Sequence, residues 1–288
     1  MSSNEKSKEI DYQPSFIGRM ARIFLPLIQK VLPYSVYRVV YNFLYTSYSL
    51  LLRKGYILRV LTAKLFGNKT KILRTQLTNQ LLPFTMGGRK ALENAFDIVK
   101  LIEDNAIPGV FIECGVAEGG TAAMLGMAHR ELGSGKREMW FFDSYEGLPE
   151  PTKEDYEDGK TGNFIRPLPK GACLGTIEQV SELLFSTLKF QKDDVHLVKG
   201  WFQDTVPKLR DTMGVVAILR LDGDWYESVK IPLDNFYHNL SPGGVVIVDD
   251  YATCFGSKKA TDEFRTEHNI TTPLMSDGRG GAWFEKLD

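Results

Sequence analysis

From residue 90 onward, short apolar runs alternate with segments in which apolar residues recur every three to four positions. Leu92, Phe96, Val99 and Ile102 share one stripe, which predicts a helix over residues 91–105. Residues 110–115 form a short, mostly apolar run, which is typical of a buried strand. The same alternation predicts later helices over residues 121–132, 176–188, 226–239 and 257–268, and later strands over residues 139–142, 195–198, 215–221 and 245–248.

Strands that alternate with helices over most of the chain predict an α/β fold with a doubly wound, mostly parallel sheet. Strands that are apolar throughout fit a sheet covered on both faces. Three connections stand out: a polar loop or lid over residues 150–171, a turn over residues 241–244, and a hairpin turn over residues 276–281 between two short strands. In such sheets, ligands bind beyond the carboxyl ends of the strands.

The N-terminal third has a different character from the rest. Residues 12–92 contain no Asp or Glu but 13 Lys and Arg, whereas residues 93–288 carry 20 basic and 33 acidic residues, a net charge of -13. The total of -1 therefore hides a basic part and an acidic part. We predict a basic, aromatic-rich helical arm over residues 1–82 and an α/β domain over residues 83–288.

The arm is apolar as well as basic. Its longest uncharged run, residues 39–52, has 14 residues, fewer than the roughly 20 that cross a membrane. We expect Pro26 and Pro33 to divide the arm into short helices, since proline disrupts a helix interior. Two interpretations stay open: the arm lies on an anionic membrane surface, or it packs on the acidic body or on a second subunit.

The composition of the chain is that of a folded protein. The 43% of hydrophobic and 25% of charged residues are ordinary for a folded soluble protein. The three cysteines, Cys114, Cys173 and Cys254, form no C-x-x-C pair, so we expect neither a disulfide framework nor a zinc site, and a reduced, cytoplasmic setting. Nucleic acid is not an expected partner, because the acidic body would repel phosphates.

Acidic residues follow several of the predicted strands. They are Glu113, Asp143, Asp222, Asp224, Asp249 and Asp250. Three carboxylates from neighbouring strand ends, Asp222, Asp249 and Asp250, suit Mg²⁺, although single members of such a set can also cap a helix or face solvent. Asp224 lies near this site and could accept a proton from a substrate hydroxyl.

A glycine-rich turn follows the first strand of the domain. Gly115, Gly119 and Gly120 precede Thr121 and a helix, and glycines let the backbone approach a ligand beside the free N–H groups of a helix start. The spacing matches neither G-x-G-x-x-G nor a P-loop. A tight turn without a ligand is the alternative. Asp143 could hold two ribose hydroxyls, or it could cap the turn that follows it.

Together these segments resemble the macrocin O-methyltransferase family, S-adenosylmethionine-dependent enzymes that methylate sugar hydroxyls of glycosylated natural products. The resemblance rests on residues 84–88, 113–120, 143–149, 200–205, 219–226 and 240–251, which keep the family's order and span about residues 84–285. The chain departs from the family between its glycines, where it has Ala117 and Glu118.

The resemblance implies a class I, Rossmann-like methyltransferase fold, a seven-stranded sheet with a terminal antiparallel strand. It implies that Glu113, Gly115, Gly119, Gly120 and Thr121 hold the methionine end of the cofactor and that Asp143 takes the ribose, with Ser144 beside it. It also implies that Trp201, Phe202 and Gln203 lie along the adenine and that Met86 belongs to a closing loop. Asp222, Asp249 and Asp250 match the family's Mg²⁺ ligands, Asp222 also borders the cofactor, and Asp224 matches the general base.

The expected function is therefore S-adenosylmethionine- and Mg²⁺-dependent O-methylation of a sugar hydroxyl on a small molecule or glycan, by an enzyme that we expect to be a homodimer. The long arm favours a membrane-bound or cell-envelope glycan over a diffusible macrolide. A catechol-type O-methyltransferase and a non-catalytic, membrane-associated protein that retains the fold are the alternatives.

Overall fold

The computed structural model describes Ile10, Tyr12, Pro14 and residues 16–164 and 168–287. Expectations that concern residues 1–9, or residues 165–167 within the predicted lid, lie outside the described residues.

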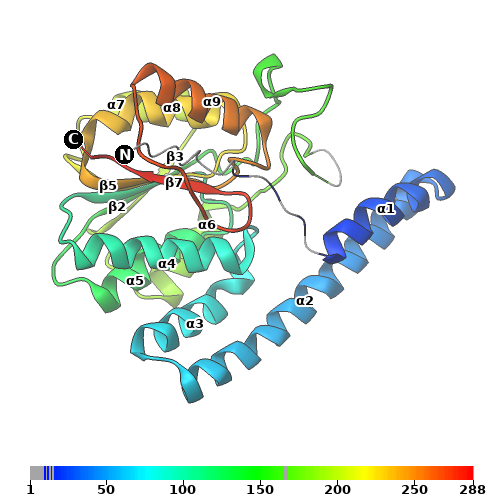
Figure 1. The fold of residues 1–288 in the computed structure, drawn as a ribbon, viewed down its shortest axis with the longest axis horizontal. Helices are drawn as coiled ribbons and strands as arrows, with labels where there is room; N and C mark the ends of the chain where they lie inside the picture. Colours follow the sequence, from blue (N-terminus) through cyan, green and yellow to red (C-terminus); the bar gives the residue numbers. More distant parts are fainter. Residues whose placement is uncertain (1–9, 11, 13, 15, 165–167, 288) are drawn as a thin grey trace, which may run out of the picture.

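The centre of the protein is a seven-stranded sheet with the strand order β3-β2-β1-β4-β5-β7-β6 (Figure 1). The first five strands are parallel, β7 runs antiparallel to β5, and β6 runs antiparallel to β7. The strands are β1 (Val110–Cys114), β2 (Met139–Asp143), β3 (Val195–Lys199), β4 (Val216–Leu221), β5 (Leu240–Val248), β6 (Met275–Ser276) and β7 (Ala282–Glu285). The predicted α/β class and the antiparallel end of the sheet are confirmed.

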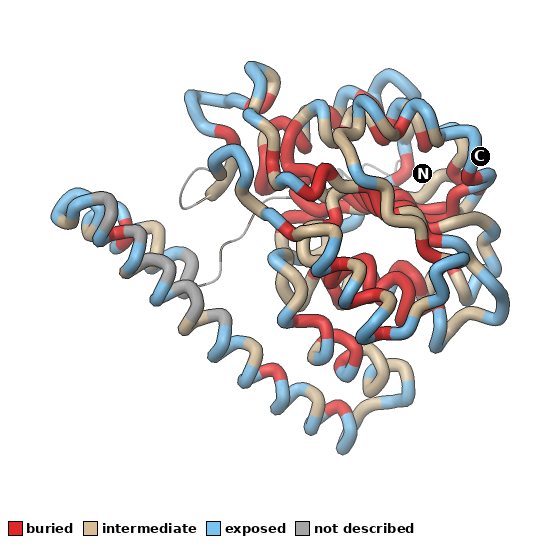
Figure 2. The backbone as a smooth tube through the Cα atoms, turned by 180° about the vertical axis from the view of Figure 1, so that it is seen from behind, coloured by how far each residue is buried: buried red, intermediate tan, exposed pale blue. Residues whose placement is uncertain are grey.

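Helices cover both faces of the sheet (Figure 1). One face carries α3 (Lys69–Leu81), α4 (Gly88–Asp104), α5 (Gly120–Leu132) and α6 (Ile177–Ser181), and the other carries α7 (Phe202–Leu209), α8 (Tyr226–Phe236) and α9 (Phe255–Glu267). Successive strand residues point to opposite faces, so Phe111 joins the core under α4 and α5 while Ile112 joins the core under α8 and α9. Figure 2 shows this buried centre between more exposed helices.

The N-terminal helices extend away from this body. They are α1 (Phe16–Val31) and α2 (Tyr34–Phe66), which together form the rod at the edge of Figure 1. The chain then turns back through α3, whose Leu77 and Leu81 join the core against α4 and α5. None of the described helices is long and apolar enough to cross a membrane. The arm boundary at residue 82 stays a prediction.

Two expectations about prolines and turns are wrong. Pro26 lies inside α1 and does not end it; its position is exposed, so water can hydrate the carbonyl that loses its partner. Pro33 does separate α1 from α2, but α2 is a single helix of 33 residues and not a short one. Residues 241–244 belong to β5: Val216 pairs with Leu240 and Ile218 with Val245, so the extra residues form an irregularity within the strand.

The helix predictions hold in part. Residues 176–188 contain the short α6 followed by the π-helix η3 (Glu182–Thr187), and α8 ends in the 3-10 turn η4 (Tyr237–Asn239). The sequence pattern missed α7, because Pro207 lies within its eight residues. A further 3-10 turn, η1 (Leu82–Phe84), joins α3 to the segment before α4.

The loop after β2 is anchored by one buried carboxylate. Asp155, in the 3-10 turn η2 (Lys153–Asp155), is fully buried and accepts a hydrogen bond at 2.6 Å from the backbone N–H of Tyr226, at the start of α8. Its other oxygen accepts hydrogen bonds from the backbone N–H and the hydroxyl of Thr152. The described part of residues 150–171 is therefore tied to the helix that follows Asp224.

We predict that Asp155→Ala lowers the free energy of unfolding by about 2–3 kcal/mol, since it leaves the Tyr226 N–H buried without its charged acceptor. Urea denaturation followed by fluorescence measures the change. Glu157→Ala, at an exposed position in the same loop, is the matched control and should change stability by less than about 0.5 kcal/mol. Equal losses in both variants would show that Asp155 is not the anchor.

Candidate active site

Strand register brings the site residues together. Glu113 of β1 lies beside Arg220 of β4, and Arg220 lies beside Ile247 of β5. Since side chains two residues apart share a face, Asp249 projects to the same face as Ile247. Glu113, Arg220 and Asp249 therefore meet at the carboxyl edge of three neighbouring strands.

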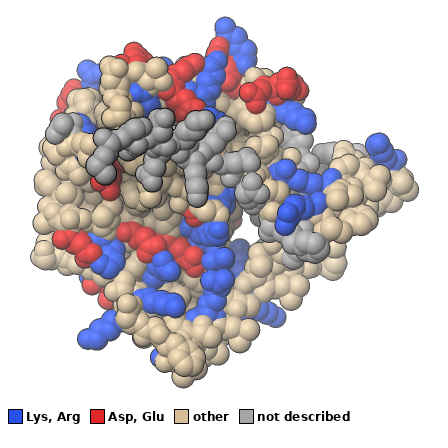
Figure 3. Space-filling model, in the orientation of Figure 1, with Lys and Arg blue, Asp and Glu red and all other residues tan. Residues whose placement is uncertain are grey.

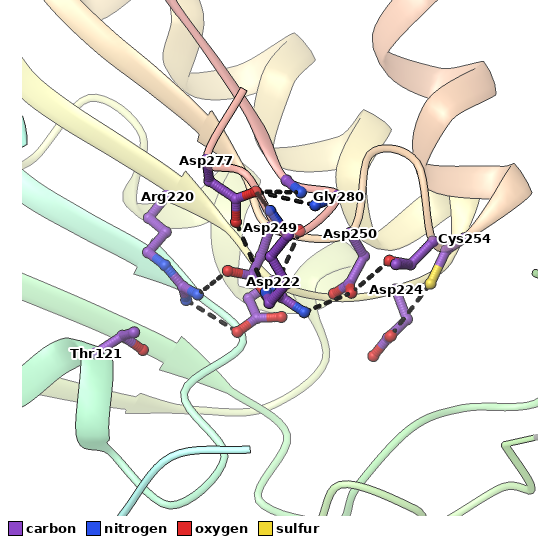
Figure 4. A network of polar contacts seen from close by, with 12 residues as sticks. Thr121, Arg220, Asp222, Asp224, Asp249, Asp250, Cys254, Asp277 and Gly280 are labelled. Atoms are coloured by element: carbon purple, nitrogen blue, oxygen red, sulfur yellow. Dashed lines mark hydrogen bonds and ion pairs between the residues drawn. The ribbon is translucent and has the colours of Figure 1, made fainter. Parts of the chain in front are cut away.

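Arg220 joins the acids of this edge. Its side chain is 1% exposed, and its guanidinium donates to Glu113, to Asp222 at 2.9 Å and to Asp249 at 2.6 Å. Figure 4 shows the arginine facing the carboxylates that follow β4 and β5. A buried cation surrounded by three carboxylates binds three strand ends to one another.

The three predicted metal ligands are close neighbours. One oxygen each from Asp222, Asp249 and Asp250 lies within 4.8 Å of the others, and a second such group consists of Asp224, Asp250 and Cys254. Asp250 also accepts a hydrogen bond from the hydroxyl of Thr253 at 2.8 Å. The donors are mainly carboxylate oxygens, which is the ligand set that Mg²⁺ prefers, so the residues fit this cation.

The charges in this cluster are unevenly compensated. Burial and the neighbouring Asp224 and Asp249 raise the pKa of Asp250 well above its usual value. Burial also acts to raise the pKa of Asp249, but Arg279 and Arg220 outweigh it and hold the pKa below its usual value. The cluster therefore retains a demand for positive charge that a proton or a cation can meet.

Asp224 lies at the side of this cluster. It is buried, its backbone has a φ of 60°, and its carboxylate accepts a hydrogen bond from the thiol of Cys254 at 3.3 Å. Burial and the charge of Asp222 raise its pKa to about 7. A carboxyl group with this pKa can accept a proton near neutral pH.

The glycine turn lies directly against β4. Gly115 has a φ of 94°, and a Cβ there would lie 1.9 Å from the carbonyl oxygen of Asp222, so only glycine fits. Gly119, with a φ of 85°, precedes Gly120 and Thr121 at the start of α5. The hydroxyl of Thr121 donates to Oε1 of Glu113 at 2.5 Å.

One carboxylate oxygen of Glu113 is an acceptor that no described donor uses. Its Oε2 is buried and has no hydrogen-bond partner among the described residues. Burial raises the pKa of Glu113 to about 7, although Arg220 opposes this shift. An unpartnered buried carboxylate oxygen beside a helix start fits the ammonium group of a bound amino acid moiety such as the methionine end of S-adenosylmethionine.

Asp143 and Ser144 shape the same turn. One oxygen of Asp143 accepts the backbone N–H groups of Val116 and Ala117 at 2.7 and 3.1 Å, and the other accepts that of Tyr145 at 2.6 Å. The Ser144 hydroxyl donates to the carbonyl of Gly147 and accepts the N–H of Glu146. A carboxylate oxygen can accept two hydrogen bonds and Oδ1 of Asp143 accepts only that of Tyr145, so Asp143 keeps capacity for a ribose hydroxyl.

The remaining predicted residues lie at the rim. Met86 is exposed, and the neighbouring Gly87 lies beside the Asp249 carboxylate: a Cβ there would be 3.6 Å from Oδ2. Phe202 lies near Gly223. Trp201 and Gln203 begin α7 beyond β3 and share no polar contact with the acid cluster in the described part of the chain.

The sequence pattern missed three residues of the site. Two of them, Arg220 and Arg279, form ion pairs with the acids. The third is Tyr145, whose buried hydroxyl has no hydrogen-bond partner among the described residues. Burial and the nearby charges of Asp143 and Glu113 raise the pKa of this hydroxyl. A basic residue inside the apolar run 216–221 was the available signal for Arg220. His129 in α5, whose helix pattern gave no sign of a buried contact, is buried and hydrogen bonded to Glu103.

A parallel sheet with an antiparallel end, a glycine turn after β1 and acids at the carboxyl edge define a class I methyltransferase. The model of the macrocin-O-methyltransferase family matches residues 24–286, and the chain belongs to this family. The resemblance seen in the sequence is confirmed, and the protein is an O-methyltransferase, for which the family implies S-adenosylmethionine as the donor.

Three known proteins show the relationship. Demethyldecarbamoylnovobiocin O-methyltransferase of Streptomyces niveus is 33% identical over 202 residues, which cover 70% of this chain and 75% of that protein. The 8-demethyl-8-(2,3-dimethoxy-alpha-L-rhamnosyl)-tetracenomycin-C 4'-O-methyltransferase of Streptomyces olivaceus is 34% identical, covering 69% and 74%. The solved structure of the O-methyltransferase NovP has a TM-score of 0.60 and 33% identity, covering 71% of this chain and 83% of that one.

We predict that Arg220→Met lowers the free energy of unfolding by about 3–5 kcal/mol, because it leaves buried carboxylates without their cation. Urea denaturation in a metal-free buffer measures the change. Arg210→Met is the control, since Arg210 is paired with Asp211 at an exposed site and should lose less than about 1 kcal/mol. Equal stability of the two variants would show that the acids do not depend on Arg220.

Proposed function

We propose that the protein is an S-adenosylmethionine- and Mg²⁺-dependent O-methyltransferase that acts on a sugar hydroxyl of a glycosylated small molecule or a glycan. The observation that supports it most is the buried, unpartnered oxygen of Glu113 at the same edge as the Asp222, Asp249 and Asp250 cluster. The Streptomyces olivaceus relative, whose name specifies a rhamnosyl group, supports a sugar as the acceptor.

In this proposal Glu113 and the turn from Gly115 to Gly120 hold the methionine end of the cofactor, Asp143 takes its ribose, and Ser144 shapes the turn beside it. The start of α7 and Met86 border the cofactor. The bound donor supplies a methyl group activated by a sulfonium. Asp222, Asp249 and Asp250 would hold Mg²⁺, which supplies Lewis-acid stabilisation of developing negative charge.

Asp224 is proposed to accept the proton of the acceptor hydroxyl. Its pKa near 7 matches this task, and the Cys254 thiol orients the carboxylate through its hydrogen bond. The protein's contribution is to position the hydroxyl and exclude water, since a displacement reaction gains most from alignment of the reacting atoms.

We predict that methyl transfer to glycoside acceptors stops in EDTA and returns with Mg²⁺, and that Asp224→Asn reduces kcat by about 10²–10⁴-fold. Radiolabelled S-adenosylmethionine and a panel of glycosides and catechols measure the transfer. Calorimetry should show that Asp224→Asn still binds the donor, whereas Asp143→Ala binds it at least about tenfold more weakly. Activity that survives chelation would show that the reaction does not need Mg²⁺. Methyl transfer only to catechols would favour the catechol-type alternative.

We also propose that the surface of α1 and α2 binds a second copy of the chain. Leu50, Leu51 and Leu52 are consecutive and each about half exposed or more, so apolar side chains cover well over a single face of α2. A helix on a membrane surface has one apolar and one polar face, whereas a helix that is apolar on most sides is normally covered by protein. The described part of α2 therefore favours a protein partner over a lipid surface.

The heptad spacing of α2 supports the same partner. Leu44, Leu51, Leu58 and Leu65 follow one another at intervals of seven and are all exposed. Such a repeat is typical of packing against another helix. The arm is basic, with Lys and Arg visible on it in Figure 3, and residues 93–288 carry a net charge of -13, so a second copy offers complementary charge.

We predict that Leu51→Glu/Leu58→Glu converts a dimer into a monomer, because two buried charges would oppose packing. Light scattering after size exclusion at micromolar concentration measures the mass. Leu287→Glu, also at an exposed leucine, is the control and should remain dimeric. A wild-type monomer that sediments with vesicles containing phosphatidylglycerol would overturn this proposal in favour of the membrane surface.

A further inference from the structure

Arg279 is a second arginine that contacts the proposed cation ligands. It lies in the turn between β6 and β7, and its Nη2 donates to the Asp249 carboxylate and, at 3.1 Å, to the Asp249 carbonyl. Its Nη1 lies 3.9 Å from the carboxylate of Asp250, and its Nε lies 3.6 Å from that of Asp277. A guanidinium therefore already supplies positive charge where the divalent cation is proposed to bind.

The carboxylate of Asp249 has both oxygens engaged by arginines. Oδ1 accepts from Arg220 at 2.6 Å, and Oδ2 accepts from Arg279. A cation at Asp249 would lie beside both guanidiniums, whose positive charge opposes its binding. Arg220 cannot withdraw, because it is 1% exposed and enclosed between strands, whereas Arg279 is 24% exposed.

Hydrogen bonds to Asp277 hold the backbone around Arg279, whereas its guanidinium is tied only by side-chain contacts. One carboxylate oxygen of Asp277 accepts the backbone N–H groups of Arg279, Gly280 and Gly281 at 2.6, 3.0 and 2.9 Å. Figure 4 shows Asp277 and Gly280 joined in this turn beside Asp249. The guanidinium can therefore leave Asp249 by side-chain rotation alone, and Asp277 remains within reach.

We propose that Arg279 is a resident counter-cation that occupies Asp249 and Asp250 and is displaced when a divalent cation binds. This inference rests on the proposed cation site and deepens it by naming what controls its occupancy. The arginine stabilises the cluster in the absence of metal and weakens metal binding, since two cations compete for the same carboxylate oxygens. Arg220 keeps its contacts in both states.

Calorimetric titration of the full-length chain with MgCl₂ tests this directly. Arg279→Gln should bind Mg²⁺ roughly tenfold more tightly than the wild type, a coupling of ordinary size between two ligands of one site. Arg279→Lys, which keeps a charge but loses the planar fork, should bind with intermediate affinity. Arg210→Gln, at an exposed ion pair away from the cluster, should bind like the wild type.

Thermal unfolding provides the second readout. Without metal, Arg279→Gln should unfold at a lower temperature than the wild type, and saturating Mg²⁺ should raise its unfolding temperature more than that of the wild type. If wild type and Arg279→Gln bind Mg²⁺ equally, or if the variant binds more weakly, the inference is wrong while the cation site stands. If neither protein binds Mg²⁺, the cation site itself is wrong and the inference falls with it.

Discussion

The buried charge of Arg220 is the constraint on which the rest of this edge depends. Removing a guanidinium from water costs several kcal/mol, and only close, well-directed anions offset that cost. Glu113, Asp222 and Asp249 provide those anions from the ends of three neighbouring chain segments. The same contacts fix the relative positions of β1, β4 and β5 where a ligand would bind, so stability and site geometry have a common origin.

The arginines do not neutralise the negative charge of every acid in the cluster, and the pKa values of these acids shift in different directions as a result. Asp249 contacts two guanidiniums and keeps a low pKa, whereas Asp250 and Asp224 have raised pKa values because burial and neighbouring acids dominate there. Adjacent carboxyls of one cluster thus differ in how strongly they hold a proton. This difference distinguishes Asp249, whose charge two arginines stabilise, from Asp224, the proposed acceptor of a substrate proton.

Much of this arrangement could be predicted from the sequence, because parallel strands bring their carboxyl ends to one edge and the acids follow those strands directly. Arg220 and Arg279 could not be predicted as members of the site. Arg220 lies within an apolar strand, and its partners become visible only once Glu113 is known to be its neighbour in the sheet. Arg279 is distant in sequence from Asp249, and His129 hides its buried contact with Glu103 for the same reason. Pro26 does not end α1 as expected, because water can hydrate the unpaired carbonyl of an exposed helix.

The arm is basic, whereas the rest of the chain is acidic, and this difference bears on what the arm contacts. Only part of α2 contacts its own body: Tyr56 donates to Glu93 at 2.7 Å, and Arg53 lies near Glu118. The exposed leucines from Leu44 to Leu65 and the basic residues among them are otherwise left uncovered by the described residues. An isolated helix of this kind gains little from propensity alone and depends on packing for its stability. A surface that is apolar, basic and helical therefore calls for an acidic, helical counterpart, and the body of another copy has both properties.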